Sequence, residues 1–131
     1  MGWSPRLEWS LEPPGLVSVF RPGESHAGRP GFLHGGLAAT LLDETMAALS
    51  LATDRVHSVT ATLSLRYRVP VPVDAGPLRM EAWYADGRAR RVRKVHGRIL
   101  LADGTTAVEA TGLFVQVSGP GGDDGVAGEA R

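Results

Sequence analysis

Residues 28–46 read Gly-Arg-Pro-Gly-Phe-Leu-His-Gly-Gly-Leu-Ala-Ala-Thr-Leu-Leu-Asp-Glu-Thr-Met, and this stretch decides the fold. A glycine-rich loop leads into alanine, leucine and methionine, which favour a helix over a strand. Residues 36–52 are therefore predicted to form one long helix, apolar on nearly every side, with Asp43 and Glu44 near its middle. A carboxylate there is disfavoured unless it is paired, hydrated or used in chemistry. Because glycine amides at a helix start suit an oxygen with negative charge, the stretch favours acyl-transfer chemistry.

The segments around this helix have the patterns of strands. Residues 16–21 predict a first strand that stops at Pro22-Gly23, and a long loop follows over 22–34. Residues 59–69 alternate apolar and polar side chains, which is typical of a half-buried strand. Further strands are predicted over 78–85, 91–101 and 106–117, because Asp-Gly pairs at 86–87 and 103–104 indicate hairpin turns.

This order of elements predicts an α+β fold with one long helix against an antiparallel sheet of about five strands. Since the helix is apolar almost all round, one flat sheet face cannot cover it, so the sheet must curl or a second subunit must help. The chain is expected to divide into an irregular lead-in (1–15), one domain (16–118) and a disordered tail rich in Gly, Asp and Ala (119–131).

Composition excludes several classes of protein. The 131 residues carry a formal net charge of zero, which argues against binding to nucleic acid or to a membrane surface. Cysteine is absent, so disulfides and thiolate metal sites are excluded. His26, His57 and His96 lack metal-ligand spacing, and no metal or cofactor is predicted. The first residues lack the apolar run of a signal peptide, and residues 37–52 are too short to span a bilayer, which favours a cytoplasmic protein.

Three segments together are similar to one known family. These are the loop Pro-Gly-Phe-Leu-His-Gly-Gly (30–36), the helix Leu-Ala-Ala-Thr-Leu-Leu-Asp-Glu-Thr (37–45) and the strand Thr-Ala-Thr-Leu-Ser-Leu-Arg-Tyr-Arg-Val-Pro-Val-Pro (60–72). They resemble the hotdog-fold acyl-CoA thioesterases, particularly the PaaI-like branch of the phenylacetic-acid pathway. Residues 104–115 are similar to the last strand of that family, so the resemblance covers roughly 16–117.

The resemblance implies a sheet wrapped around the helix, a homodimer or homotetramer with sites between subunits, and hydrolysis of acyl-CoA without a metal. The catalytic carboxylate of the family, nine residues after the motif histidine His34, matches Asp43, and the oxyanion donor matches the Gly35 amide. Thr60 matches a hydroxyl residue associated with the attacking water or carboxylate. One departure is Gly28, where some relatives carry asparagine.

The chemistry needs a polarised carbonyl and an activated nucleophile. Gly35 supplies the first through its amide and the helix N-terminus, whereas Asp43 either attacks the carbonyl itself or takes a proton from water. The two are eight positions apart, which at about 1.5 Å per residue is roughly 12 Å along the helix. If both act on one thioester, Asp43 must face Gly35 of a partner whose helix runs antiparallel.

Plainer interpretations stay open at each position. Gly35-Gly36 are also explained by a simple turn, and Asp43 by a structural role at an interface. Glu44 points about 100° away around the helix and is either a solvated carboxylate or the base itself. His34 either orients the loop or donates to the carbonyl. By strand parity Thr60 lies on the face opposite Leu63 and Leu65, which normally means solvent.

Substrate contacts are expected at both ends of the ligand. Leu37, Leu41 and Met46 are expected to line the acyl chain between subunits, and Gly36 is also expected to contact the substrate. A basic run over 88–98 is either a solvated strand face or a contact for the phosphates of CoA through Arg90, Arg91 and Lys94. The functional alternatives are a hotdog module that binds acyl-CoA without hydrolysis, as a carrier or sensor, and a purely structural oligomer.

Overall fold

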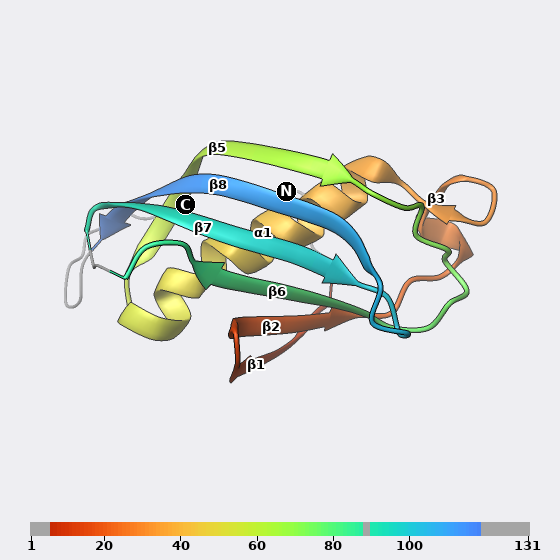
Figure 1. The fold of residues 1–131 in the computed structure, drawn as a ribbon, viewed down its shortest axis with the longest axis horizontal. Coiled ribbons are helices and arrows are strands. Elements are labelled where there is room, and N and C mark those ends of the chain that lie inside the picture. Colours follow the sequence, from red (N-terminus) through yellow and green to blue (C-terminus); the bar gives the residue numbers. More distant parts are fainter. Residues whose placement is uncertain (1–5, 88–89, 119–131) are drawn as a thin grey trace.

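The computed structural model describes residues 6–87 and 90–118. One long helix, α1 (Gly35–Asp54), packs against a six-stranded antiparallel sheet that curves around it (Figure 1). The strands are β1 (Glu8–Glu12), β2 (Gly15–Phe20), β5 (His57–Tyr67), β6 (Leu78–Tyr84), β7 (Val92–Leu100) and β8 (Thr106–Ser118). Their order across the sheet is β1-β2-β6-β7-β8-β5, which leaves β1 and β5 as edges. The predicted α+β fold with a curved antiparallel sheet is confirmed.

The loop before the helix has its own local structure. It contains a short 3-10 helix, η1 (Glu24–His26), and a small two-stranded sheet of β3 (Ala27–Arg29) and β4 (Phe32–Leu33). The Leu33 amide donates to the Val71 carbonyl at 2.8 Å, and the His34 amide donates to the His26 carbonyl at 3.0 Å. These bonds hold the chain in place where α1 begins.

The core lies between α1 and the concave face of the sheet. The buried face of α1 comprises Ala38, Leu41, Leu42, Thr45, Met46, Leu49 and Ser50. One polar contact crosses this core, because the Ser18 and Thr45 hydroxyl oxygens lie 2.6 Å apart. Thr45 donates to the Leu41 carbonyl at 2.9 Å, so Ser18 is the donor to Thr45. Both hydroxyls are thus satisfied where an unpaired one would be costly.

The sixth strand corrects one prediction. Residues 8–12 lie in the predicted irregular lead-in, yet they form β1, which pairs with β2 through a turn at Pro13-Pro14. All five residues of β1 are exposed, so the segment lacks the burial pattern that marks a strand in a sequence. Its strand conformation comes from backbone pairing with β2. Residues 1–5 of the predicted lead-in, the whole predicted tail (119–131) and residues 88–89 of the basic run lie outside the described residues.

A β-bulge in β5 corrects a second prediction. Thr60 pairs with Phe114 and Thr62 with Leu113, so Ala61 is an extra residue without an opposite partner. The Ser58 hydroxyl donates to the Ala47 carbonyl of α1 at 3.2 Å, and Thr60 also reaches α1. Beyond the bulge, Leu63 and Leu65 pack against the core. Thr60 is therefore on the same face as Leu63 and Leu65, and the parity argument is wrong because it assumed an unbroken strand.

We predict that the strand opposite this bulge tolerates no side chain at Gly112. A Cβ atom there would lie 2.7 Å from the Thr62 carbonyl oxygen, and a backbone atom in a sheet cannot move aside easily. Gly112→Ala should lower the free energy of unfolding by about 1–3 kcal/mol, measured by urea denaturation. Gly23→Ala is the control, since a Cβ there meets no described atom within 4 Å. Equal stability of the two variants would contradict the prediction.

Candidate functional site

His34 caps the start of α1. It has extended backbone angles (φ −61°, ψ 132°), and its carbonyl accepts from the Leu37 and Ala38 amides. Its ring Nδ1 accepts from the Gly36 amide at 2.9 Å, which requires a neutral ring with the proton on Nε2. This bond caps α1 but does not distinguish the two interpretations of His34, since an Nε2–H can still donate to a substrate carbonyl. Its own backbone is held against Gly28, where a Cβ would lie 3.1 Å from the His34 Cα.

Gly35 is the first residue of α1 and presents a free amide. The first N–H groups of a helix have no acceptor within it. The neighbouring Gly36 amide is taken by His34, whereas in residues 6–87 and 90–118 no acceptor is found for the Gly35 amide. Gly35 is exposed, so its N–H is open to a ligand at the positive end of the helix dipole.

Asp43 is held by Thr60. The Thr60 hydroxyl donates to Asp43 Oδ1 at 2.6 Å, and Asp43 is half-buried between α1 and β5. In the described part of the chain Oδ2 receives no hydrogen bond, so one carboxylate oxygen is fixed while the other is available. Glu44 is exposed, and no contact to Thr60 is found for it.

Tyr67 is a site residue that the sequence interpretation missed. Its hydroxyl donates to the Gly35 carbonyl at 2.8 Å and so ties the end of β5 to the start of α1. Although the strand pattern already placed Tyr67 on the face of Leu63 and Leu65, no local signal shows that this face reaches Gly35 at that point. The contact joins residues 32 positions apart in the chain.

Two pockets border the start of α1. One has a volume of about 380 Å³ and is lined mostly by apolar side chains around Gly35, including Phe32, Leu33, Tyr67, Val69 and Val71, with Arg29 and Arg68 also in its wall. The other, about 400 Å³, is lined by Ser25, His26, Ala27, His34 and Leu37. Leu37 thus lines the second pocket and not the one around Gly35.

Other predicted substrate contacts lie elsewhere. Leu41 and Met46 are fully buried in the core, and neither lines a pocket described above. Arg90, Arg91 and Lys94 are exposed and lie just before or at the start of β7. The Arg93–Asp54 ion pair ties this part of β7 to the C-terminal end of α1, whereas Gly35 lies at the other end of the helix. Gly36 lies beside Gly35, but its amide is already bonded to His34.

Within one chain the structure does not bring Gly35 and Asp43 together. They remain eight positions apart on a continuous helix, roughly 12 Å along its axis. The pocket around Gly35 does not include Asp43. The chain therefore presents two separate candidate groups, the free amide of Gly35 and the oriented carboxylate of Asp43.

Two further features limit what the described residues offer. No group of three or more His, Asp or Glu side chains in residues 6–87 and 90–118 is arranged to hold a metal ion. In those same ranges, no helix combines the length and the hydrophobicity needed to cross a bilayer.

Comparison with known proteins places this arrangement in a family. Residues 30–107, more than half of the chain, match the thioesterase superfamily. Acyl-coenzyme A thioesterase THEM4 of Xenopus laevis is 30% identical over 110 residues, 78% of this chain and 45% of that protein. THEM4 of Mus musculus is 28% identical over 77% of this chain and 43% of its own length. The chain therefore spans less than half the length of these curated relatives.

Solved structures confirm the fold. A Streptococcus mutans protein bound to acetyl-CoA superposes with a TM-score of 0.77 at 18% identity, over 89% of this chain and 93% of that one. The PaaI protein of the E. coli phenylacetic acid degradation operon gives a TM-score of 0.71 at 16% identity, over 79% and 73% of the two chains. The predicted hotdog fold and its resemblance to thioesterases are confirmed.

We predict that His34 stabilises α1 through its cap. His34→Ala removes the acceptor for the Gly36 amide and should lower the free energy of unfolding by about 1 kcal/mol in urea denaturation. His34→Asn is the matched variant, because its side-chain oxygen can accept the same bond, and it should stay close to wild type. An unchanged stability of His34→Ala would show that the cap contributes nothing.

Proposed function

This chain belongs to the thioesterase superfamily, and on that premise we propose that it hydrolyses acyl-CoA thioesters to the free acid and CoA. Asp43 acts as base or nucleophile, and the Gly35 amide stabilises the oxyanion. The two groups come from different subunits of a homodimer, which can pair further into a tetramer. Each subunit thus contributes half of each of two sites.

The geometry of β5 is the observation that carries this proposal. Near one end, Thr60 holds Asp43, and at the other end Tyr67 holds Gly35. β5 is an edge strand of 11 residues, so its outer backbone groups are free to pair with another strand. Antiparallel pairing of β5 with its copy, about a two-fold axis near Leu63 and Ser64, brings the Gly35 end of one subunit beside the Asp43 end of the other.

The reaction follows from these two groups. The thioester carbonyl oxygen lies at the Gly35 amide, which stabilises the negative charge that develops on this oxygen when the carbon is attacked. In one route Asp43 takes a proton from water, whose oxygen bonds to the acyl carbon. In the other, Asp43 Oδ2 attacks and forms an acyl anhydride that water then cleaves. Both routes break the carbon–sulfur bond, and the CoA thiolate takes up a proton.

Thr60 and Tyr67 act as positioning residues for this chemistry. The 2.6 Å bond from Thr60 fixes Asp43 Oδ1 and leaves Oδ2 available for the reaction. Tyr67 fixes the first turn of α1 and, with it, the direction of the Gly35 amide. A reactive group held by a second contact needs less reorganisation on the way to the transition state.

The pocket beside Gly35 and the exposed cations near the end of α1 support a position for each end of the substrate. The apolar pocket of about 380 Å³ beside Gly35 takes the acyl group. The nucleotide of CoA lies near Arg90, Arg91 and Lys94 of the subunit that supplies Asp43. Asp43 and the helix end at Asp54 are eleven residues apart, about 16 Å along α1, so an extended CoA arm can bridge them.

Substitution of Asp43 tests the carboxylate. Asp43→Asn keeps the shape and can still accept from Thr60, but it can neither attack the carbonyl nor take a proton. We expect kcat/KM for acyl-CoAs of increasing chain length to fall by at least about 10², measured by thiol release. Glu44→Gln is the matched control on the next residue and should retain the wild-type rate. Loss of activity in Glu44→Gln alone would place the carboxylate one residue further along.

Gly35 offers a direct test of the oxyanion amide. Proline is well tolerated as the first residue of a helix, and the extended His34 before it is compatible with proline, so Gly35→Pro removes the N–H without breaking α1. We expect kcat to fall by about 10²–10³. Gly35→Ala keeps the N–H, and its Cβ has room because the nearest described atom lies 3.8 Å away. Equal rates for Gly35→Pro and Gly35→Ala would refute the assigned role.

Mixing the inactive variants tests the shared site. A heterodimer of Asp43→Asn and Gly35→Pro subunits contains one intact site, with Gly35 from the first chain and Asp43 from the second. Random assembly of equal amounts should restore about a quarter of the wild-type activity. If each site were complete within one chain, the mixture would stay as inactive as its two components.

A further inference from the structure

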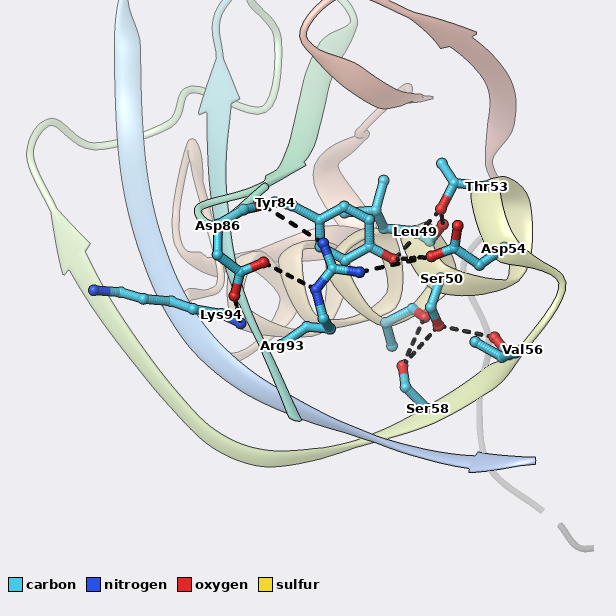
Figure 2. Close-up of polar contacts among 11 residues, drawn as sticks. Leu49, Ser50, Thr53, Asp54, Val56, Ser58, Tyr84, Asp86, Arg93 and Lys94 are labelled. Carbon is cyan, nitrogen blue, oxygen red and sulfur yellow. Dashed lines mark hydrogen bonds and ion pairs between the residues drawn. The ribbon is translucent and has the colours of Figure 1, made fainter. Parts of the chain in front are cut away.

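A polar cluster joins the end of α1 to the β6–β7 hairpin. It contains Arg93 from β7, Tyr84 from β6, Asp54 from α1 and Asp86 from the turn between the strands (Figure 2). Arg93 is only 5% exposed, whereas its neighbours in the basic run, Arg90, Arg91 and Lys94, are exposed. The structure thus divides the basic run into one buried arginine and three surface cations.

Arg93 contacts both carboxylates of this corner. Its Nε donates to Asp86 Oδ1 at 2.9 Å, and its Nη1 lies 3.7 Å from Asp54 Oδ2. The same Asp54 oxygen accepts from the Tyr84 hydroxyl at 3.1 Å. The hydrogen bond from Arg93 lowers the pKa of Asp86 below its ordinary value, as expected for a carboxylate paired with a guanidinium.

Tyr84 holds the guanidinium in place. The Arg93 Cζ atom lies 3.5 Å from the centroid of the Tyr84 ring, a stacking contact that favours arginine over lysine. Burial raises the pKa of Tyr84, so its hydroxyl remains a neutral donor to Asp54. Arg93 is therefore fixed toward the two acids and is not available to a ligand.

The three exposed cations differ from Arg93 in their ion pairs. Among residues 6–87 and 90–118 no ion pair of Arg90, Arg91 or Lys94 is found. Arg90 nevertheless lies near enough that its charge helps to lower the pKa of Asp86. The formal charges of Asp54, Asp86 and Arg93 sum to −1. With the three exposed cations, the net charge of this corner is +2.

We propose that Arg93 is a positioning residue for the CoA nucleotide, because it occupies Asp54 and Asp86 and so leaves Arg90, Arg91 and Lys94 to bind phosphates. This inference rests on the proposed function, which places CoA at this corner. Without Arg93, Asp86 would be free to pair with the nearby Arg90 and would also repel the phosphates. Arg93 thus acts through the charge of its neighbours and does not touch the ligand.

The test is binding of CoA alone, measured by isothermal titration calorimetry with the full chain. Arg93→Gln should raise the Kd for CoA by about tenfold at low salt, and the effect should shrink as salt screens the charges. Adding Asp86→Asn to Arg93→Gln removes the released carboxylate and should restore most of the affinity. A purely structural role of Arg93 predicts no such rescue.

Arg98→Gln is the matched control on the same strand. Arg98 also pairs with a carboxylate, the buried Glu81 at 2.7 Å, and lies over an aromatic ring, Trp83, at 5.0 Å. Its loss removes the same chemical group at a distance from the hairpin, and the Kd for CoA should stay at the wild-type value. A tenfold weakening in Arg98→Gln as well would overturn the specific role of Arg93.

The single variant Asp86→Asn keeps the proposal testable if Arg93→Gln does not fold. It removes a negative charge beside the exposed cations, so CoA should bind as tightly as to wild type or more tightly. Weaker binding to Asp86→Asn would overturn the proposal, as would wild-type affinity in a folded Arg93→Gln.

Hydrolysis separates this inference from the proposed function. Arg93→Gln should raise KM for acyl-CoA but leave kcat/KM unchanged for the matching acyl-N-acetylcysteamine thioester, which lacks the nucleotide. Equal losses with both substrates would overturn the role of Arg93 while the thioesterase stands. A different outcome would refute the proposed hydrolysis alone: Arg93→Gln weakens CoA binding as expected, but the wild-type chain hydrolyses neither thioester.

Discussion

One extra residue in the edge strand β5 determines which way the side chain of Thr60 points, and with it how Asp43 is held. Ala61 bulges from β5 and reverses the direction of the side chains before it, so Thr60 faces α1 and bonds to Asp43. Without the bulge, a strand of period two would turn Thr60 outward whenever Leu63 and Leu65 face the core. A carboxylate on an apolar helix would then lack the donor that fixes it. Bulges often re-aim side chains beside functional sites in this way.

β5 links this carboxylate to the opposite end of the domain. Its far end carries Tyr67, which holds the Gly35 carbonyl at the start of α1. Because helix and strand are both stiff, the two half-sites stay apart within one chain. In the proposed dimer this separation is an advantage, since a two-fold axis across β5 joins unlike ends and builds two equivalent sites from one strand.

In the proposed dimer, the start of α1 from one subunit and the middle and end of α1 from its partner contact different parts of the ligand. The N-terminus offers a free amide and an apolar pocket, the middle offers Asp43, and the C-terminal corner offers exposed cations. At that corner the buried Arg93 pairs with Asp54 and Asp86. These two carboxylates are therefore neutralised by Arg93 and not by the exposed cations. The outer sheet face uses a similar contact, where Glu81 is buried between Arg79 and Arg98.

The amino-acid sequence was enough to predict the helix, five of the six strands of the large sheet and the two candidate residues Gly35 and Asp43. These depend on local properties, namely side-chain periodicity, turn residues and the spacing of a loop and helix motif. Even the separation of Gly35 and Asp43 follows from the rise of a helix.

Four features became known only from contacts between distant segments. Thr60 faces α1, residues 8–12 form β1, Tyr67 reaches Gly35, and Arg93 is buried while Arg90 is exposed. Leu41 and Met46 were likewise assigned to the core by packing, since an apolar helix residue looks the same in a sequence whether it lines a pocket or fills the interior. In each case the deciding contact joins segments distant in the chain, and local periodicity carries no information about such pairings.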